Sequence, residues 1–73
     1  MINQVVAGRY RHYKGKEYEV FAVATHSETE EKLVVYRLLY GDFSYWVRPL
    51  TMFTETVIVD GIEQPRFSLI EKS

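Results

Sequence analysis

Short runs of alternating apolar and polar residues, separated by turn residues, extend along most of the chain. The clearest run is 17–25. One face of that run would carry four apolar or aromatic residues: Tyr18, Val20, Ala22 and Ala24. Successive side chains of a β-strand point to opposite faces, so this alternation predicts a strand. Similar runs recur about every ten residues with no helix-period segment between them, which predicts an antiparallel all-β domain.

The turn residues between these runs set the expected order of elements. The pattern predicts strands over 8–14, 17–25, 32–40, 45–48 and 54–59, and a last strand that ends near Ile70. Pro49 donates no backbone hydrogen bond and should end the fourth strand, with one helical turn following at Leu50–Phe53. Asp60-Gly61 predicts a tight hairpin, because both central positions of a type I′ turn need positive φ. Pro65 either confines the last strand to a sheet edge or splits it.

The segment 32–40 is apolar on both of its faces. One face carries Val34, Tyr36, Leu38 and Tyr40. The other face carries Leu33, Val35 and Leu39. A strand that is apolar on both faces needs a cover on each of them. For the second face we expect either the N-terminal residues Ile2, Val5 and Val6 or a second copy of the chain, which would make a homodimer.

A small antiparallel sheet of this kind tends to curl and close, because closure removes the exposed strand edges that promote aggregation. The fold class is therefore predicted as all-β, a small SH3-like barrel of five to six antiparallel strands. A half-open sheet or an OB-like barrel is the alternative. The length of 73 residues indicates one domain, 1–73, in which residues 1–7 and 71–73 are expected to be flexible or peripheral.

The composition supplies enough apolar surface for a core that is not cross-linked by disulfides. Hydrophobic residues make up 47% of the chain and aromatic residues 15%, and one aromatic ring buries a large area. The absence of cysteine excludes a disulfide, a thiolate metal site and a cysteine nucleophile, and it fits a reducing compartment, so we predict a cytoplasmic location. The first residues carry neither a basic run nor a long apolar run, so no signal peptide is expected. We expect no membrane partner, because the apolar runs are far shorter than the roughly 18 residues of a membrane span.

The net charge of -1 argues against a protein that coats DNA but leaves room for a local basic surface. Four cations fall within eight residues: Arg9, Arg11, Lys14 and Lys16. Most such clusters are solvated faces, and a minority are binding surfaces.

Several spaced motifs resemble a known family. They are Gly8-x-Tyr10-x-His12-Tyr13-Lys14-Gly15, His26-Ser27-Glu28-Thr29, Trp46-Val47-Arg48-Pro49 and Pro65-Arg66-Phe67. The chain is similar over almost its whole length to a bacterial family catalogued as domain of unknown function 1653. The resemblance implies a small SH3-type barrel, and it implies no activity. Phe43-Ser44-Tyr45 departs from the more polar loop that the family would lead us to expect before the tryptophan.

Aromatic and basic residues suggest a ligand-binding surface. Its candidate residues are Arg11, His12, Tyr13, Lys14, His26, Glu28, Tyr36, Tyr45, Trp46 and Arg48. Aromatic rings beside cations bind Pro-rich peptides or the bases of single-stranded nucleic acid. The alternative is that Trp46 and His12 simply pack in the core. A non-catalytic binding or adaptor module is the leading interpretation, with a protein partner, a homodimer or nucleic acid as the partner.

No residue pattern points clearly to catalysis. His26-Ser27-Glu28 holds the residue types of a hydrolytic triad, but neighbours in sequence cannot align as nucleophile, base and orienting group. A metal site from His12, His26, Glu28 and Asp42 would match no compact ligand spacing. We therefore predict no catalytic residue, no metal and no cofactor. A small hydrolase that uses His12, His26 and Glu28 stays as the alternative, and it requires the three side chains to meet.

Overall fold

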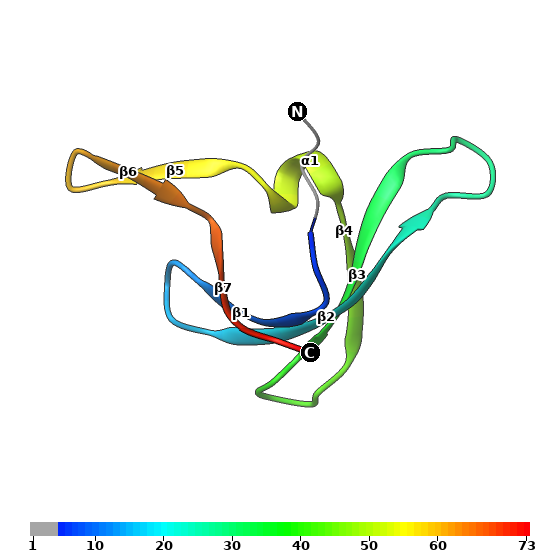
Figure 1. Ribbon diagram of the computed structural model, residues 1–73, viewed down its shortest axis with the longest axis horizontal. Coiled ribbons are helices and arrows are strands. Elements are labelled where there is room, and N and C mark those ends of the chain that lie inside the picture. Colours follow the sequence, from blue (N-terminus) through cyan, green and yellow to red (C-terminus); the bar gives the residue numbers. More distant parts are fainter. Residues whose placement is uncertain (1–4) are drawn as a thin grey trace.

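The computed structural model describes residues 5–73, and within them seven strands and one helical turn build the fold (Figure 1). The elements are β1 (Gly8–His12), β2 (Glu17–Thr25), β3 (Lys32–Leu38), β4 (Tyr45–Pro49), α1 (Leu50–Phe53), β5 (Thr56–Val59), β6 (Ile62–Pro65) and β7 (Phe67–Lys72). Five strands form one antiparallel sheet in the order β4-β3-β2-β1-β7, and β5 and β6 form a separate hairpin. The prediction of an all-β domain is confirmed.

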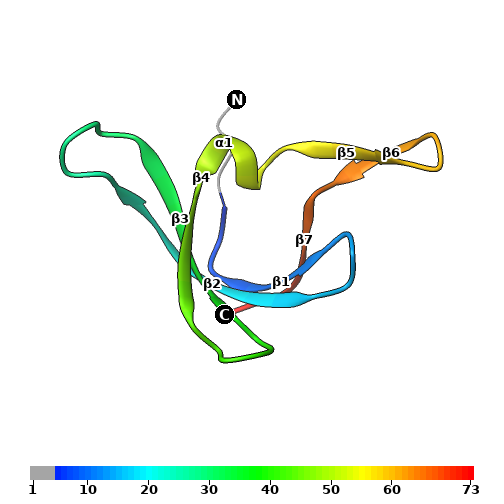
Figure 2. The ribbon, with the colours of Figure 1, turned by 180° about the vertical axis from the view of Figure 1, so that it is seen from behind.

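The five-stranded sheet is open along its hydrogen-bond ladders, because β4 and β7 are its two edges. The predicted barrel is therefore not confirmed. The sheet instead curls around a concave side over which α1 lies, while the β2–β3 and β5–β6 hairpins extend in opposite directions (Figures 1 and 2). We call the concave side the inner face and its reverse the outer face. Within residues 5–73 no helix is long and apolar enough to cross a membrane.

Turn residues and prolines end the elements much as the sequence indicates. The bounds of β2 and of α1 agree with prediction, and β4 ends at Pro49. Asp60 and Gly61 have φ values of 53° and 77°, so the predicted hairpin between β5 and β6 is confirmed. The last segment contains two strands, so a split at Pro65, one of the two predicted outcomes, is the one observed. It divides after Pro65, and β6 pairs with β5 whereas β7 pairs with β1, which raises the number of strands above the predicted five or six.

The core lies on the inner face and is built largely from aromatic rings. Its buried members are Tyr10, Tyr18, Val20, Val34, Tyr36, Leu38, Phe53 and Phe67. Phe53 of α1 and Phe67 of β7 stack face to face with ring centroids 4.2 Å apart. The ring of Tyr18 meets those of Tyr36 and Phe67 edge-on at 5.4 and 5.5 Å, the arrangement that the charge distribution of aromatic rings favours.

A β-bulge between Val20 and Ala22 reverses the side-chain alternation of β2. Strict alternation predicted Ala22 and Ala24 on the same face as Val20. Instead Ala22 lies opposite Val35 and Ala24 opposite Leu33, and both pairs are on the outer face. The prediction was wrong because a bulge adds one residue to a strand, which moves every later side chain to the other face.

The outer face of β3 is not covered by the described N-terminal residues. Val5 packs against the buried cluster on the inner face, and Val6 is exposed. The predicted N-terminal cover is therefore wrong for these two residues, and Ile2 lies outside the described residues. At the other terminus the predicted peripheral tail is largely a strand, because Glu71 and Lys72 pair with β1.

The close approach of β1 and β7 requires glycine at position 8. A Cβ atom on Gly8 would collide with the carbonyl oxygen of Glu71 and lie 3.0 Å from the Cα of Lys72. Gly41 has φ +60° and open space around it, so it provides a control for the cost of positive φ alone. We expect Gly41→Ala to cost about 1 kcal/mol of unfolding free energy. We expect Gly8→Ala to cost about 1–3 kcal/mol more, because two backbones must separate.

Chemical denaturation of both glycine variants and the unmodified chain measures this difference. Equal losses for Gly8→Ala and Gly41→Ala would show that β1 and β7 do not pack as closely as described.

Candidate functional site

Aromatic rings and cations gather at the end of the sheet next to the β1–β2 turn, around the margin of the core. The strands bring them together from distant parts of the sequence. His12 ends β1 and lies directly opposite Phe67 of β7, Arg48 comes from β4, and Arg66 precedes β7. We call the following residues the aromatic–basic cluster: His12, Tyr13, Lys14, Lys16, Tyr40, Trp46, Arg48 and Arg66. Phe67 and Tyr18 form its floor.

The His12 ring is held on three sides. Its centroid lies 5.0 Å from that of Phe67 and 4.5 Å from that of Tyr13. Its Nδ1 accepts a hydrogen bond of 3.1 Å from the backbone N–H of Lys14. An imidazole that accepts at Nδ1 carries its proton on Nε2 when it is neutral, so His12 offers an N–H donor on its other side.

Arg48 and Arg66 add donors around the same phenylalanine. The guanidinium carbon of Arg48 lies 5.5 Å from the centroid of the Phe67 ring. One terminal nitrogen of Arg66 donates to Glu55 at 3.0 Å. Within the described part of the chain the Nε atoms of both arginines are buried and have no hydrogen-bond partner. A buried donor without an acceptor costs about 1–3 kcal/mol. Because both Nε atoms are buried, only the terminal nitrogens of these arginines can meet a ligand.

The charges around His12 are reflected in its protonation. Burial lowers the pKa of His12, and the positive charges of Arg48, Arg66 and Lys14 lower this pKa further. The site therefore has a positive local potential although the whole chain carries a net charge of -1.

Two tyrosines extend the floor toward the β1–β2 turn. The hydroxyl oxygens of Tyr18 and Tyr40 lie 3.3 Å apart, and the ammonium group of Lys16 lies 4.6 Å from the centroid of the Tyr40 ring. Burial, together with the hydrogen bond to Tyr40, raises the pKa of Tyr18 well above its ordinary value. Tyr18 therefore stays a neutral hydroxyl at physiological pH.

Trp46 adds an exposed aromatic ring on the same face of the sheet as the cluster. It lies directly opposite Tyr36, so both side chains are on the inner face. Tyr36 is only 2% exposed, whereas Trp46 on the edge strand is 51% exposed. The indole N–H donates to the Ser44 hydroxyl at 2.8 Å, which orients the ring. Tyr36 is a core residue, which corrects its prediction as a surface contact.

The other predicted aromatic and basic residues lie elsewhere. Arg11 and Tyr45 are on the outer face, because side chains alternate along β1 and β4. Arg11 pairs with Glu17 at 2.9 Å, and Tyr45 stacks on Phe21 with centroids 5.6 Å apart. The predicted set therefore divides between two faces, with Trp46 on one and Tyr45 on the other.

His26 and Glu28 belong to the β2–β3 turn. The Nδ1 of His26 accepts from the backbone N–H groups of Glu28 and Thr29 at 3.1 and 3.3 Å. His12 lies near the opposite end of β2, whose nine residues span about 27 Å at roughly 3.3 Å per residue. The hydrolase hypothesis, which required the histidines to meet, is therefore wrong.

The metal site considered from the sequence is not formed either. Asp42 accepts the backbone N–H of Ser44 in its own turn. Among residues 5–73 no group of three or more histidine, aspartate or glutamate side chains is placed to hold a metal ion.

An open groove continues from the cluster along β7. Its volume is about 420 Å³, and its lining residues are Arg11, His12, Tyr13, Gln64, Pro65, Ser68, Leu69 and Ile70. The groove lies between the end of β1 and the β6–β7 junction. An extended ligand on the cluster could therefore follow the chain past His12 and Tyr13.

The outer face carries an apolar surface on β2, β3 and β4, which we call the outer patch. Its members are Phe21, Ala22, Ala24, Leu33, Val35, Tyr45, Val47 and Pro49, placed in register by the strand pairs and the stacked ring of Phe21. Arg37 borders the patch, with its guanidinium carbon 5.7 Å from the Phe43 centroid and 5.6 Å from that of Tyr45.

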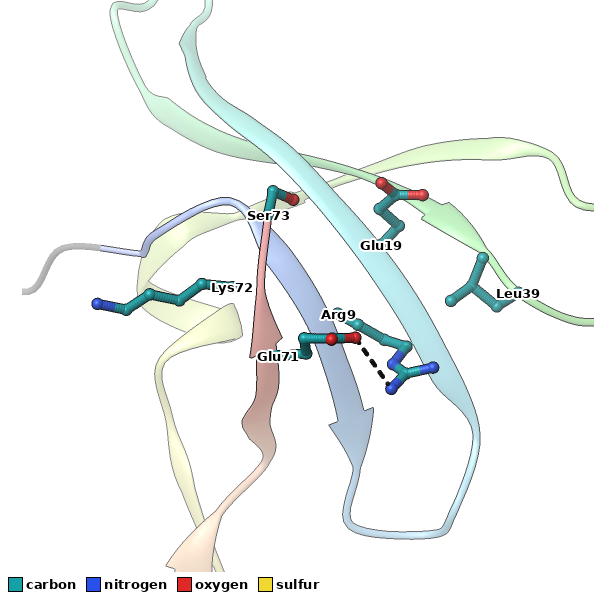
Figure 3. Close-up of a pocket in the computed structure, with 6 residues that line it drawn as sticks. All are labelled: Arg9, Glu19, Leu39, Glu71, Lys72 and Ser73. Carbon is teal, nitrogen blue, oxygen red and sulfur yellow. Dashed lines mark hydrogen bonds and ion pairs between the residues drawn. The ribbon is translucent and has the colours of Figure 1, made fainter.

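The predicted apolar group of Leu33, Val35 and Leu39 does not form one continuous surface. Leu33 and Val35 belong to the outer patch, whereas Leu39 lies among charged residues. Leu39 lines a separate pocket with Arg9, Glu19, Glu71, Lys72 and Ser73 (Figure 3). Arg9 donates to Glu71 at 3.3 Å there, so this part of the outer face is charged rather than apolar (Figure 3).

Sequence reasoning missed Lys16, Tyr40 and Arg66 as members of the cluster. Only strand pairing brings Arg66 next to His12, since Phe67 lies opposite His12 in the β1–β7 ladder. A weak signal existed in Pro65-Arg66-Phe67, which was singled out as a motif but given no role.

Comparisons with known proteins agree with the fold. A family model described as "Protein of unknown function (DUF1653)" matches residues 8–69. A crystal structure of a protein belonging to DUF1653 from Bordetella bronchiseptica is similar with a TM-score of 0.86 and 36% sequence identity, over 96% of this chain and 92% of that one. No curated protein matches. Because the family model covers most of the chain and the solved structure is 36% identical over 96% of it, the chain belongs to the DUF1653 family.

Proposed function

We propose that the domain is a non-catalytic binding module whose aromatic–basic cluster holds single-stranded nucleic acid. One observation carries the proposal: three cations without acidic partners lie against aromatic rings, Lys14 against Tyr13, Lys16 against Tyr40 and Arg48 against Phe67. The ion pairs of the described residues involve Arg9, Arg11 and Arg66, and they leave Lys14, Lys16 and Arg48 without one. The cytoplasmic location predicted from the cysteine-free sequence is part of the same proposal.

The chemistry of the cluster favours a nucleic acid over a Pro-rich peptide. Each nucleotide combines a base that can stack on an aromatic ring with a phosphate that pairs with a cation. Trp46 is half exposed with a fixed orientation, and Arg48 lies two residues further along the same face of β4. A Pro-rich peptide would use the rings but not the unpaired cations.

We expect short single-stranded DNA or RNA to bind on the cluster and to change the fluorescence of Trp46, the only tryptophan in the chain. If about three cations contact phosphates, log K should fall with log salt with a slope of about −2. Arg48→Gln should weaken binding and make this slope shallower by roughly 0.7. Trp46→Ala should weaken binding about ten-fold or more through lost stacking. Because this variant has no tryptophan fluorescence, its binding is measured by NMR.

Lys32→Gln is the matched control, because it removes the same charge from the β2–β3 end of the sheet, where the Lys32 ammonium group donates to the Thr25 hydroxyl at 2.8 Å. An equal loss in Lys32→Gln and Arg48→Gln would mean that only overall charge matters, which would contradict a site on the cluster. If a Pro-rich peptide moves the amide signals around Trp46 and oligonucleotides move none, the ligand is a peptide and the nucleic-acid proposal is wrong.

The outer patch supports a second candidate function, self-association into a homodimer. Apolar side chains on three adjacent strands have no cover among the described residues, and Tyr45 and Val47 are 66% and 58% exposed. Exposed apolar surfaces of this kind on small proteins usually mark an interface. Arg37 and Glu19 lie opposite each other at the border of the patch, and neither forms an ion pair in the described residues. Two copies packed face to face could pair these opposite charges across a two-fold axis.

We expect the chain to sediment as a dimer at high concentration and Val47→Glu to sediment as a monomer, because a buried carboxylate would face an apolar surface. Ile58→Glu is the matched control, since Ile58 is 74% exposed on the separate β5–β6 hairpin. Analytical ultracentrifugation over a wide range of concentration measures both. A monomer at every concentration, or dissociation by both substitutions, would remove this candidate.

A further inference from the structure

Two side chains with hydrogen-bond donors lie against the Phe67 ring at the edge of the core, and a third belongs to the residue that precedes Phe67. The imidazole of His12 lies 5.0 Å from the Phe67 ring centroid, and the guanidinium carbon of Arg48 lies 5.5 Å from it. Arg66 precedes Phe67 in the chain, and its carbonyl accepts the backbone N–H of Tyr13, the neighbour of His12. Strands β1 and β4 and the single residue between β6 and β7 therefore supply the three donors to the margin of the core.

The donors are only partly used within the described chain. Arg66 gives one terminal nitrogen to Glu55, and its side chain is still 27% exposed. The Nε atoms of Arg48 and Arg66 are buried, so the terminal nitrogens are the donors that a ligand can reach. His12 uses Nδ1 as an acceptor, so its Nε2–H is the free side of the neutral ring. The positive charges of the two guanidinium groups disfavour a second proton on the His12 ring. Glu55 pairs with Arg66 only, so the charge of Arg48 is not neutralised by this carboxylate.

We propose that His12, Arg48 and Arg66 form a seat for one oxyanion, the phosphate group of a bound strand. The identity of the strand rests on the proposed function, whereas the seat itself does not. Guanidinium groups bind phosphate oxygens with charge-assisted hydrogen bonds, and a neutral imidazole adds a further donor. The phosphate of a strand has two non-bridging oxygens on a tetrahedral phosphorus, and these accept hydrogen bonds from directions that do not share one plane. A carboxylate also has two oxygens, but donors to its sp² oxygens prefer the plane of the group, so it fits donors from three separate segments less well.

An anion in the seat would lie beside the His12 ring, so anion binding can be followed through the pKa of His12. The groups that face His12 are Tyr13 and Lys14 of the turn, Tyr18 of β2, Arg48 of β4 and Arg66 before β7. Burial, followed by the three cations, lowers the pKa of His12 in the free protein. A bound anion supplies the opposite charge and therefore raises this pKa. His26 lies at the far end of β2 and should be unaffected, so it is an internal control.

The experiment follows the imidazole C–H signals of His12 and His26 by NMR as pH changes, in sodium phosphate and in sodium chloride of the same ionic strength. At saturation we expect phosphate to raise the pKa of His12 by about 1 unit relative to chloride. The His26 signals serve as the internal control and should not differ between the two salts. An equal value for His12 in the two salts would mean that only general screening acts, and it would overturn the seat.

Arg48→Gln tests whether the seat is the place that phosphate occupies. In chloride this variant should raise the pKa of His12, because one repelling charge is gone. The additional rise in phosphate should be largely lost. Lys32→Gln removes a charge from the β2–β3 end of the sheet and should leave both results unchanged. Arg66→Gln also breaks the pair with Glu55, so its amide spectrum must first show that the fold is intact.

Other anions and oligonucleotides complete the test. If acetate raises the pKa of His12 as much as phosphate does, the seat is not selective for phosphate and the proposal is wrong. If oligonucleotides bind to the cluster but phosphate leaves His12 unchanged, the proposed function holds and the seat fails. If phosphate acts on His12 and no oligonucleotide binds, the seat holds and the proposed function fails.

Discussion

The stacked rings of Phe53 and Phe67 are the contact on which the rest of the structure depends. The hydrogen-bond ladders leave β4 and β7 as free edges, so they do not close the sheet. Phe53 belongs to the helical turn that directly follows β4, and Phe67 begins β7. Their rings are nearly parallel, at 3°, with centroids 4.2 Å apart. Apolar packing thereby joins the two edges that backbone hydrogen bonds do not join. Tyr10 and Tyr36 contact Phe53, so the stack is continuous with the remaining core.

The same stack assembles the aromatic–basic cluster. Because Phe67 is drawn to the inner face, the residue before it, Arg66, is brought beside the end of β1, and Arg48 of the opposite edge reaches over the Phe67 ring. Core and candidate site thus share one side chain. A buried ring usually gains its stability from apolar neighbours, but here part of its surface is covered by a guanidinium group. The positive potential at His12 is a consequence of how the open sheet is closed, and no local sequence pattern encodes it.

This dependence explains which features of the structure could be predicted from the sequence and which could not. Local chemistry determines the features that were predicted correctly: positive φ at Asp60 and Gly61, the strand end at Pro49, and the turn at Leu50–Phe53. Features decided by pairing between distant strands were not predicted. The bulge after Val20 is visible only in the register with β3, and it reverses the faces of Ala22 and Ala24. Likewise Tyr45 and Trp46 were assigned to one surface, although alternation along β4 separates them.

The bulge also determines that the surfaces of the two candidate functions lie on opposite faces of the sheet. By turning Ala22 and Ala24 outward, it completes an apolar surface on the face opposite to the aromatic–basic cluster. Self-association through the outer patch would therefore leave the cluster of each copy open, and two clusters would be held at a fixed separation. A strand long enough to reach both would bind the second cluster at a high effective concentration, so two weak sites would together bind tightly. Self-association would then strengthen the binding that a single small domain provides, rather than compete with it.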